Sequence, residues 1–170
     1  MKFSLKFFLL ILLSLGLYAC GGGESESSTT DSTASDSSQP AVAPVAELSI
    51  EGNDQMKYNK DRLEVFAGQT VKLTLKHAGQ MAVESMGHNW VLLKPGTDVA
   101  EFGQASATAK ETDYIPASMA GQVIVHTKML GGGEEVTIEF EAPAAGTYDF
   151  MCSFPGHYAF MKGKFVVSEP

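Results

Sequence analysis

Apolar and polar residues alternate in short runs along most of the chain after residue 45. In five runs every second side chain is apolar, as in strands with one buried face; they span residues 47–51, 62–66, 71–77, 136–140 and 147–151. Three further runs are more continuously apolar, as is typical of inner strands, and span residues 89–93, 122–126 and 163–167. Turn-forming residues separate these runs, so eight short strands predict an antiparallel β-sandwich or barrel.

One segment interrupts this pattern. Residues 94–121 are rich in alanine and mostly lack the alternation of a strand. We therefore expect an insertion that carries one or two helical turns between two strands. Residues 46–170 have the usual size of one domain with one hydrophobic core.

The N-terminus has the pattern of an export signal. Lys2 and Lys6 precede an apolar run over residues 7–17, as in secretory signal peptides. This run is shorter than the roughly 20 residues of a spanning helix. The sequence "LYACG" that follows resembles the cleavage site of bacterial lipoproteins. We predict a signal peptide over residues 1–19 and a lipid on Cys20; an ordinary cleaved signal with Cys20 as a stray thiol is the alternative.

A polar segment separates the predicted anchor from the domain. Residues 20–45 are rich in Ser and Gly and nearly free of large apolar side chains. Such a segment cannot bury enough apolar surface to offset the entropy of ordering, so we expect a disordered tether. The domain should therefore lie on the periplasmic side of a bacterial membrane. Gly21 lacks the Asp that, by resemblance, retains lipoproteins in the inner membrane, which favours the outer membrane.

Charge excludes one class of partner. The chain has a formal net charge of −8, and its basic residues form no cluster. Proteins that bind nucleic acids use such clusters to contact phosphates. No nucleic-acid partner is expected.

The segment "CSFPGHYAFM", residues 152–161, carries the candidate chemistry. Cys152, His157 and Met161 place a thiol, an imidazole and a thioether close together. Exported proteins usually pair their cysteines, so a lone exported thiol needs another explanation. Two histidines and a cysteine with a weak methionine ligand make a blue-copper site. His88, in "MGHNW" at the start of a strand, is the candidate for the second histidine.

Other interpretations of these residues stay open at this point. His77 and His126 end strand runs, and we assign both a structural role. A zinc site would favour four strong ligands and would not use a thioether. A catalytic Cys–His pair would need a substrate pocket and oxyanion donors, and the sequence shows neither, so an enzyme is not expected. Cys152 and Met161 could also fill a core.

Four segments together resemble azurin, a small bacterial blue copper protein of the cupredoxin family. They are "IEGNDQMKYN", "MGHNWVLL", "VIVHTKMLGGGE" and "CSFPGHYAFMKGKFVV", and the likeness runs in order from Leu48 to Val167. The resemblance implies an all-β Greek-key sandwich with a helical insertion. It also implies one type 1 copper ion with an equatorial plane of two histidines and a thiolate, a weak axial thioether and an axial backbone carbonyl. The corresponding residues are His88, His157, Cys152, Met161 and Gly87.

The resemblance extends to the surroundings of the metal. Asn89 and Phe154 match positions that hydrogen-bond to the thiolate sulfur and cover it, and such groups tune a metal. Azurins dock their redox partners on an apolar patch around the loop histidine. The corresponding patch around His157 consists of Met81, Met86, Phe154, Pro155 and Ala159.

The chain departs from azurin in two respects. Azurins have a disulfide whose positions fall near Ala46 and Gly68, where no cysteine occurs. The typical contribution of such a disulfide, about 2–4 kcal/mol, must be replaced or done without. Azurins are also usually soluble periplasmic proteins, whereas this chain has a predicted lipid anchor.

Two functions fit an exported copper lipoprotein. The first is a carrier that moves single electrons between redox proteins such as c-type cytochromes or copper-containing reductases. The second is a copper storage or delivery lipoprotein without redox duty. Trafficking sites tend to be exposed Met and His clusters that release metal, whereas the ligands here are few, mixed and placed at the end of a sandwich. We therefore predict electron transfer.

Overall fold

The computed structural model describes residues 42–170, in which β-strands are the main regular secondary structure. The strands are β1 (Val45–Asn53), β2 (Lys57–Tyr58), β3 (Arg62–Phe66), β4 (Thr70–His77), β5 (Val91–Leu93), β6 (Val123–His126), β7 (Glu135–Glu141), β8 (Gly146–Met151) and β9 (Lys162–Ser168). The predicted signal peptide, lipidated Cys20 and most of the predicted tether lie outside the described residues. Among residues 42–170, no helix has the length and apolar character needed to cross a membrane.

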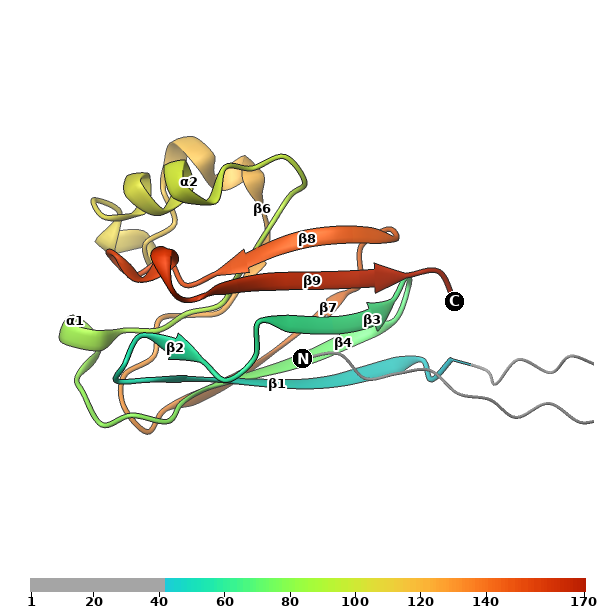
Figure 1. The fold of residues 1–170 in the computed structure, drawn as a ribbon, viewed down its shortest axis with the longest axis horizontal. Coiled ribbons are helices and arrows are strands. Elements are labelled where there is room, and N and C mark those ends of the chain that lie inside the picture. The colour runs from blue at the N-terminus through green and yellow to red at the C-terminus, as the bar shows by residue number, and fades with distance from the viewer. Residues whose placement is uncertain (1–41) are drawn as a thin grey trace, which may run out of the picture. The chain divides into compact units, whose positions relative to one another are not determined.

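The strands form two sheets that face each other across the core (Figure 1). One sheet has the order β2-β1-β4-β7 and the other β3-β9-β8-β5-β6. The predicted β-sandwich is therefore confirmed. The expectation of purely antiparallel pairing is wrong, because β1 pairs with β4 and β3 with β9 in parallel. Alternation identifies the buried face of a strand, but it does not identify the strand's neighbours or their direction.

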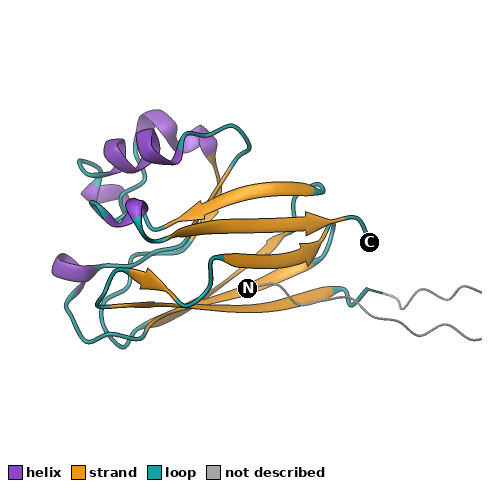
Figure 2. Ribbon diagram, in the orientation of Figure 1, coloured by secondary structure: helices purple, strands orange, loops and turns teal. Residues whose placement is uncertain are grey.

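The helical segments gather at one side and one end of the sandwich (Figure 2). They are α1 (Val83–Met86), α2 (Val99–Ser106), η1 (Lys110–Thr112), η2 (Ala117–Gln122) and η3 (His157–Ala159). The helical insertion predicted around residues 94–121 is thus present as α2, η1 and η2. Asp98 starts α2, because its carboxylate accepts the backbone N–H groups of Ala100 and Glu101. Sequence reasoning missed α1 and β2, which are too short to show a periodicity.

The core lies between the sheets and is built around Trp90. This side chain is fully buried, with its ring centroid 5.7 Å from that of Phe150 and 6.0 Å from that of Phe165. Alternating residues of β4, including Leu73 and Leu75, face this cluster. Burial of such apolar surface stabilises the sandwich by about 25 cal/mol per Å². The two sheets therefore form a firm support for the loops at their ends.

The loops that carry the candidate ligands lie at one end of the sandwich. Figure 1 shows α1 and the turn between β8 and β9 at that end, and the C-terminus at the other. The strand β5 follows the loop that contains His88, and the β8–β9 turn contains residues 152–161. The fold thus brings together two segments that are more than sixty residues apart in the sequence.

Candidate metal centre

Backbone hydrogen bonds close the loop between β8 and β9 into a fixed shape. The N–H of Cys152 donates to the carbonyl of Met161 at 2.9 Å, and the N–H of Met161 donates to the carbonyl of His157 at 2.8 Å. The N–H of His157 in turn donates to the carbonyl of Phe154 at 3.0 Å. Gly156 has φ of 82°, a conformation that favours glycine. The spacing of the three side chains thus follows from a compact turn.

His88 is held in place from several directions. Its backbone N–H and C=O both pair with Leu130, at 3.0 and 2.8 Å. Its Nε2 lies 3.0 Å from the carbonyl oxygen of Asn53, and His77 stacks on its ring at a centroid distance of 4.2 Å. Nε2 therefore carries the proton and donates, which leaves the lone pair on Nδ1. That buried Nδ1 has no hydrogen-bond partner.

Three side chains converge at this point. The ligand atoms of His88, Cys152 and His157 all lie within 4.8 Å of one another. Sγ of Cys152 is 3.6 Å from Nδ1 of His157 and 3.8 Å from the carbonyl oxygen of Gly87. The three side chains are nearly or fully buried, with 0–2% of their surface exposed.

Met161 borders the same site. It is fully buried and packs in one apolar cluster with Cys152 and Phe154. A Cβ placed on Gly52 would lie 3.1 Å from Cε of Met161 and 2.7 Å from Cδ2 of His88. The methionine tip and the imidazole therefore both lie against the backbone of β1 at residue 52. Only glycine leaves room for them there.

Burial sets the protonation of the site. It raises the pKa of the Cys152 thiol to about 12, although the backbone N–H groups of Asn89 and Phe154 hydrogen-bond to the sulfur and lower that pKa. Burial also lowers the pKa values of His88 and His157 to about 4. At neutral pH the metal-free site therefore holds a neutral thiol and two neutral imidazoles. Both imidazoles offer lone pairs, and only the thiol must lose a proton to bind a metal.

The donor set fits a copper ion. A buried nitrogen without a partner is costly, and a metal bound to Nδ1 of His88 would remove that cost. This set of a thiolate, two imidazoles and a thioether is suited to copper. It is poorly suited to hard cations such as Mg²⁺ and Ca²⁺, which prefer oxygen ligands. The hydrogen bond from Nε2 of His88 to Asn53 is the outer contact that fixes the tautomer of a metal-binding histidine.

The comparisons with known proteins agree with this chemistry. Residues 44–168 match the model of the family described as copper binding proteins, plastocyanin/azurin family. The chain belongs to the plastocyanin/azurin family. The candidate metal centre therefore fits one type 1 copper ion, and the predicted cupredoxin fold is confirmed.

Several relatives illustrate this membership. Azurin from Achromobacter denitrificans is 40% identical over 78% of this chain and 91% of its own length. Auracyanin-A from Chloroflexus aurantiacus is 36% identical over 99% of this chain and 100% of its own. The solved structure of auracyanin A, described as a "blue" copper protein, has a TM-score of 0.65 and covers 73% of this chain and 99% of that one at 36% identity. Auracyanin from Roseiflexus castenholzii, at 38% identity, gives a TM-score of 0.64 over 72% of this chain and 96% of that one.

A hydrogen-bond network ties the two ligand-bearing segments of this cupredoxin together. Oδ1 of Asn89 accepts the N–H of Ser153 at 2.8 Å, and Nδ2 of Asn89 donates to Oγ of Ser153 at 2.8 Å and to the carbonyl of Asp113 at 3.1 Å. The sequence pointed to Asn89 but missed Ser153 and Asp113. Asp113 acts through its backbone, so its side chain gave no signal. The position of Ser153, directly after Cys152, could have suggested its role.

The residues of the predicted docking patch differ in exposure. Met81 is 41% exposed and Ala159 is exposed, while Met86 and Pro155 are half-buried. Phe154 is only 8% exposed and covers the ring of His157 at a centroid distance of 4.7 Å. Phe160, which is 69% exposed, was not among the predicted patch residues. An apolar residue directly before Met161, on the loop itself, was the available signal.

The two remaining histidines have other surroundings. His77 is buried, with Nε2 2.7 Å from the carbonyl of Met86 and Nδ1 accepting the N–H of Gly79. Both ring nitrogens are therefore occupied. His126 is exposed at the end of β6, with Nδ1 3.0 Å from the carbonyl of Thr127. Neither belongs to the cluster of potential metal ligands.

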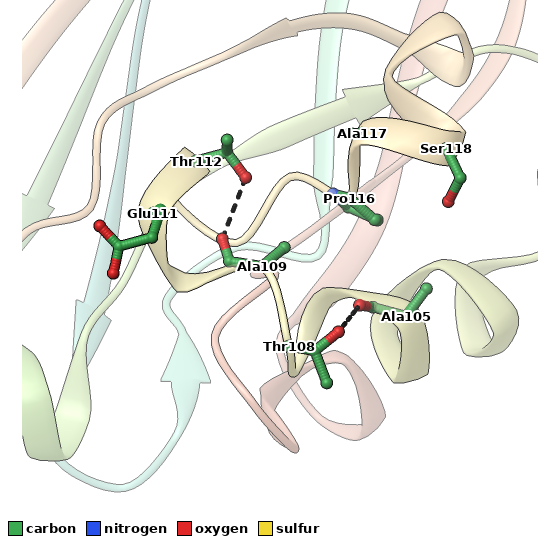
Figure 3. A pocket seen from close by; sticks show the side chains of 8 residues that line it. All are labelled: Ala105, Thr108, Ala109, Glu111, Thr112, Pro116, Ala117 and Ser118. Atoms are coloured by element: carbon green, nitrogen blue, oxygen red, sulfur yellow. Dashed lines mark hydrogen bonds between the residues drawn. The ribbon is translucent and has the colours of Figure 1, made fainter.

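A separate hollow of about 470 Å³ lies on the helical insertion (Figure 3). It is lined mainly by small side chains, with Glu111 the one charged residue among them. The hydroxyls of Thr108 and Thr112 there donate to the carbonyls of Ala105 and Ala109 and are thus already used. None of the lining residues belongs to the metal centre.

Proposed function

We propose that this protein is a type 1 copper carrier that moves single electrons between redox proteins at the periplasmic face of a bacterial membrane. His88, Cys152 and His157 would hold the copper, with Met161 and the carbonyl of Gly87 as weaker ligands. A bound copper ion supplies a one-electron couple between Cu(I) and Cu(II). The observation that carries the proposal is the buried convergence of the three donor side chains within 4.8 Å.

The protein holds these donors in one arrangement. The loop ligands are fixed by backbone hydrogen bonds within the β8–β9 turn, and His88 is fixed by Asn53 and Leu130. A carrier needs a site that changes little between oxidation states, because each structural change slows electron transfer. Coordination by two histidines and a thiolate is intermediate between the preferences of Cu(I) and Cu(II).

The electron would leave through the surface near His157. Phe154 covers this ring, which would keep water from a bound metal. The docking patch of this proposal consists of Met81, Met86, Pro155 and Ala159, to which we add Phe160, the exposed apolar residue of the same loop. An apolar rim of this kind suits brief docking by redox proteins such as c-type cytochromes or copper-containing reductases.

The N-terminal part gives the location in this proposal. Residues 1–19 would be the signal peptide, and residues 20–45 would link a lipid on Cys20 to the domain at residues 46–170. Auracyanin-A aligns with 99% of this chain, so the alignment includes nearly all of this N-terminal part. A relative from Neisseria meningitidis, 40% identical over 68% of this chain and 63% of its own length, is named outer membrane protein H.8.

The decisive experiment measures electron exchange and copper loss on the same purified protein. An intense blue band of the oxidised copper protein would establish the thiolate–copper bond. We expect fast electron self-exchange, and loss of copper to a chelator over hours or longer. Rapid copper transfer to an acceptor with slow electron exchange would reverse this assignment in favour of copper storage or delivery.

A charge placed in the docking patch tests whether electrons leave the protein there. Met86→Glu should slow electron exchange through charge repulsion and lost packing, and it should leave the blue band in place. Ser168→Glu adds the same charge at the exposed end of β9 and serves as the control. Equal rates of electron exchange in the two variants would contradict electron transfer through this patch.

The anchor is tested separately by fractionating cells. Cys20→Ala should leave the protein soluble or unprocessed, with the copper spectrum unchanged. One acyl chain binds membranes only marginally, whereas a lipoprotein cysteine carries several. A processed Cys20→Ala protein that stays in the membrane fraction would exclude lipidation at this residue.

A further inference from the structure

Tyr58 connects the main core to the metal centre. It ends the two-residue strand β2, which pairs with β1 at Gly52 and Asn53. Its ring packs against both the central apolar cluster and the cluster that contains Cys152, and it meets Phe150 edge-on at 5.8 Å. A phenylalanine would fill the same space, so the hydroxyl calls for its own explanation.

The Tyr58 hydroxyl donates a hydrogen bond to the backbone carbonyl of Asn89. Every other polar group of Asn89 is also engaged. Its side chain is bonded to Ser153 and Asp113, and its N–H hydrogen-bonds to the sulfur of Cys152. Asn89 is fully buried, so no water replaces a lost partner. The hydrogen bond from the Tyr58 hydroxyl to the Asn89 carbonyl is the contact that reaches Asn89 from β2.

We propose that Tyr58 is a positioning residue that holds the Asn89 backbone so that its N–H stays on the Cys152 sulfur, and that it thereby raises the reduction potential of the site. This inference rests on the proposed copper-carrier function. An N–H bond to the sulfur stabilises the more electron-rich reduced centre. Loosening that bond should therefore lower the potential.

The hydroxyl is suited to a permanent donor role. A phenol is protonated at physiological pH and offers one O–H donor. The Tyr58 hydroxyl therefore keeps donating to the carbonyl of Asn89. No proton transfer is involved.

The test compares Tyr58→Phe with Tyr148→Phe. The Tyr148 hydroxyl also donates to a backbone carbonyl, that of Ala144 at 2.7 Å, but in the turn before β8 and not at the metal centre. Both changes remove one oxygen and keep the ring, so both proteins should fold. The first measurement is amide hydrogen exchange at Asn89 in the metal-free proteins; the second is the reduction potential of the copper-loaded proteins.

We expect exchange at Asn89 to be roughly two- to tenfold faster in Tyr58→Phe, the equivalent of one lost hydrogen bond. We also expect its potential to shift downward, with both quantities unchanged in Tyr148→Phe. An unchanged potential in Tyr58→Phe, or equal shifts in the two variants, would overturn the inference even though the proteins are blue. A wild-type protein without a blue band would instead overturn the proposed function, and the potential-tuning role with it.

Discussion

Replacing Gly52 with alanine should disturb the metal centre directly from the strand behind it. The new Cβ would lie 2.7 Å from Cδ2 of His88, whereas ordinary contacts begin at 3.4 Å. The imidazole must therefore retreat by about 0.7 Å. The tip of Met161, 3.1 Å from the new atom, is flexible and can give way more easily.

His88 has little freedom to retreat. Its ring is bonded to the Asn53 carbonyl at 3.0 Å and lies against His77 at 4.2 Å. Inserting a methyl group into such a packed place costs about 1–3 kcal/mol. We expect Gly52→Ala to lower the unfolding free energy of the metal-free protein by that amount, and to weaken or shift the blue band of the loaded protein.

Gly121→Ala is the matched control. A Cβ at Gly121 meets nothing within 4 Å, and this residue does not have a positive φ. Alanine there should leave stability unchanged or raise it by up to about 1 kcal/mol, because it restricts the unfolded chain. Denaturant unfolding of the metal-free variants and visible spectra of the loaded variants provide the comparison. If Gly52→Ala matched Gly121→Ala in both measurements, the close approach of His88 to β1 would be refuted.

Three further predictions concern the ligands. Cys152→Ser should fold but lack the blue band, because oxygen is a poor substitute for sulfur toward copper; a variant that stays intensely blue would remove the thiolate assignment. Met161→Gln should stay coloured with a lower reduction potential, because a harder oxygen ligand favours Cu(II). An equal or higher potential measured by electrochemistry would exclude Met161 as a ligand. The unfolding free energy of the metal-free protein should fall as pH decreases from about 6.5 to about 4, because His88 and His157 take up protons in the unfolded state at a higher pH than in the folded state. A double variant with both histidines replaced by Gln should lose that part of the pH dependence, and a profile identical to wild type would contradict the lowered pKa values.

Local patterns predicted the elements of the fold better than their arrangement. The alternation of "RLEVF" and "VKLTLKH" corresponds closely to β3 and β4, because a half-buried strand must place apolar residues at every second position. Pairing depends on contacts between distant segments, such as that of β3 with β9 at the C-terminus. No local pattern encodes these contacts, and so the two parallel pairs were not predicted.

In the candidate site, the ligands could be predicted from the sequence, but the groups that orient them could not. Cys152, His157 and Met161 stand out because a thiol, an imidazole and a thioether are chemically rare together. The groups that orient them are ordinary: the carbonyl of Asp113 and the hydroxyl of Tyr58 act from other segments. Their roles depend on tertiary position, and composition and spacing carry no trace of that position.

The absence of an azurin-type disulfide has a counterpart in the structure. Gln69 lies next to Gly68, which is near one of the two positions that match the azurin cysteines, and its side chain is only 8% exposed. Its Oε1 accepts the N–H of Phe66 at 2.7 Å, and its Nε2 donates to the carbonyl of Ala43 at 2.6 Å. Only the bond to Ala43 joins segments that are distant in the chain. One such bond contributes about 0.5–1.5 kcal/mol, which is less than the about 2–4 kcal/mol typical of a disulfide. Gln69 thus links the β3–β4 turn to the segment that enters β1, the same two regions that the disulfide would join, without needing an oxidised pair of cysteines.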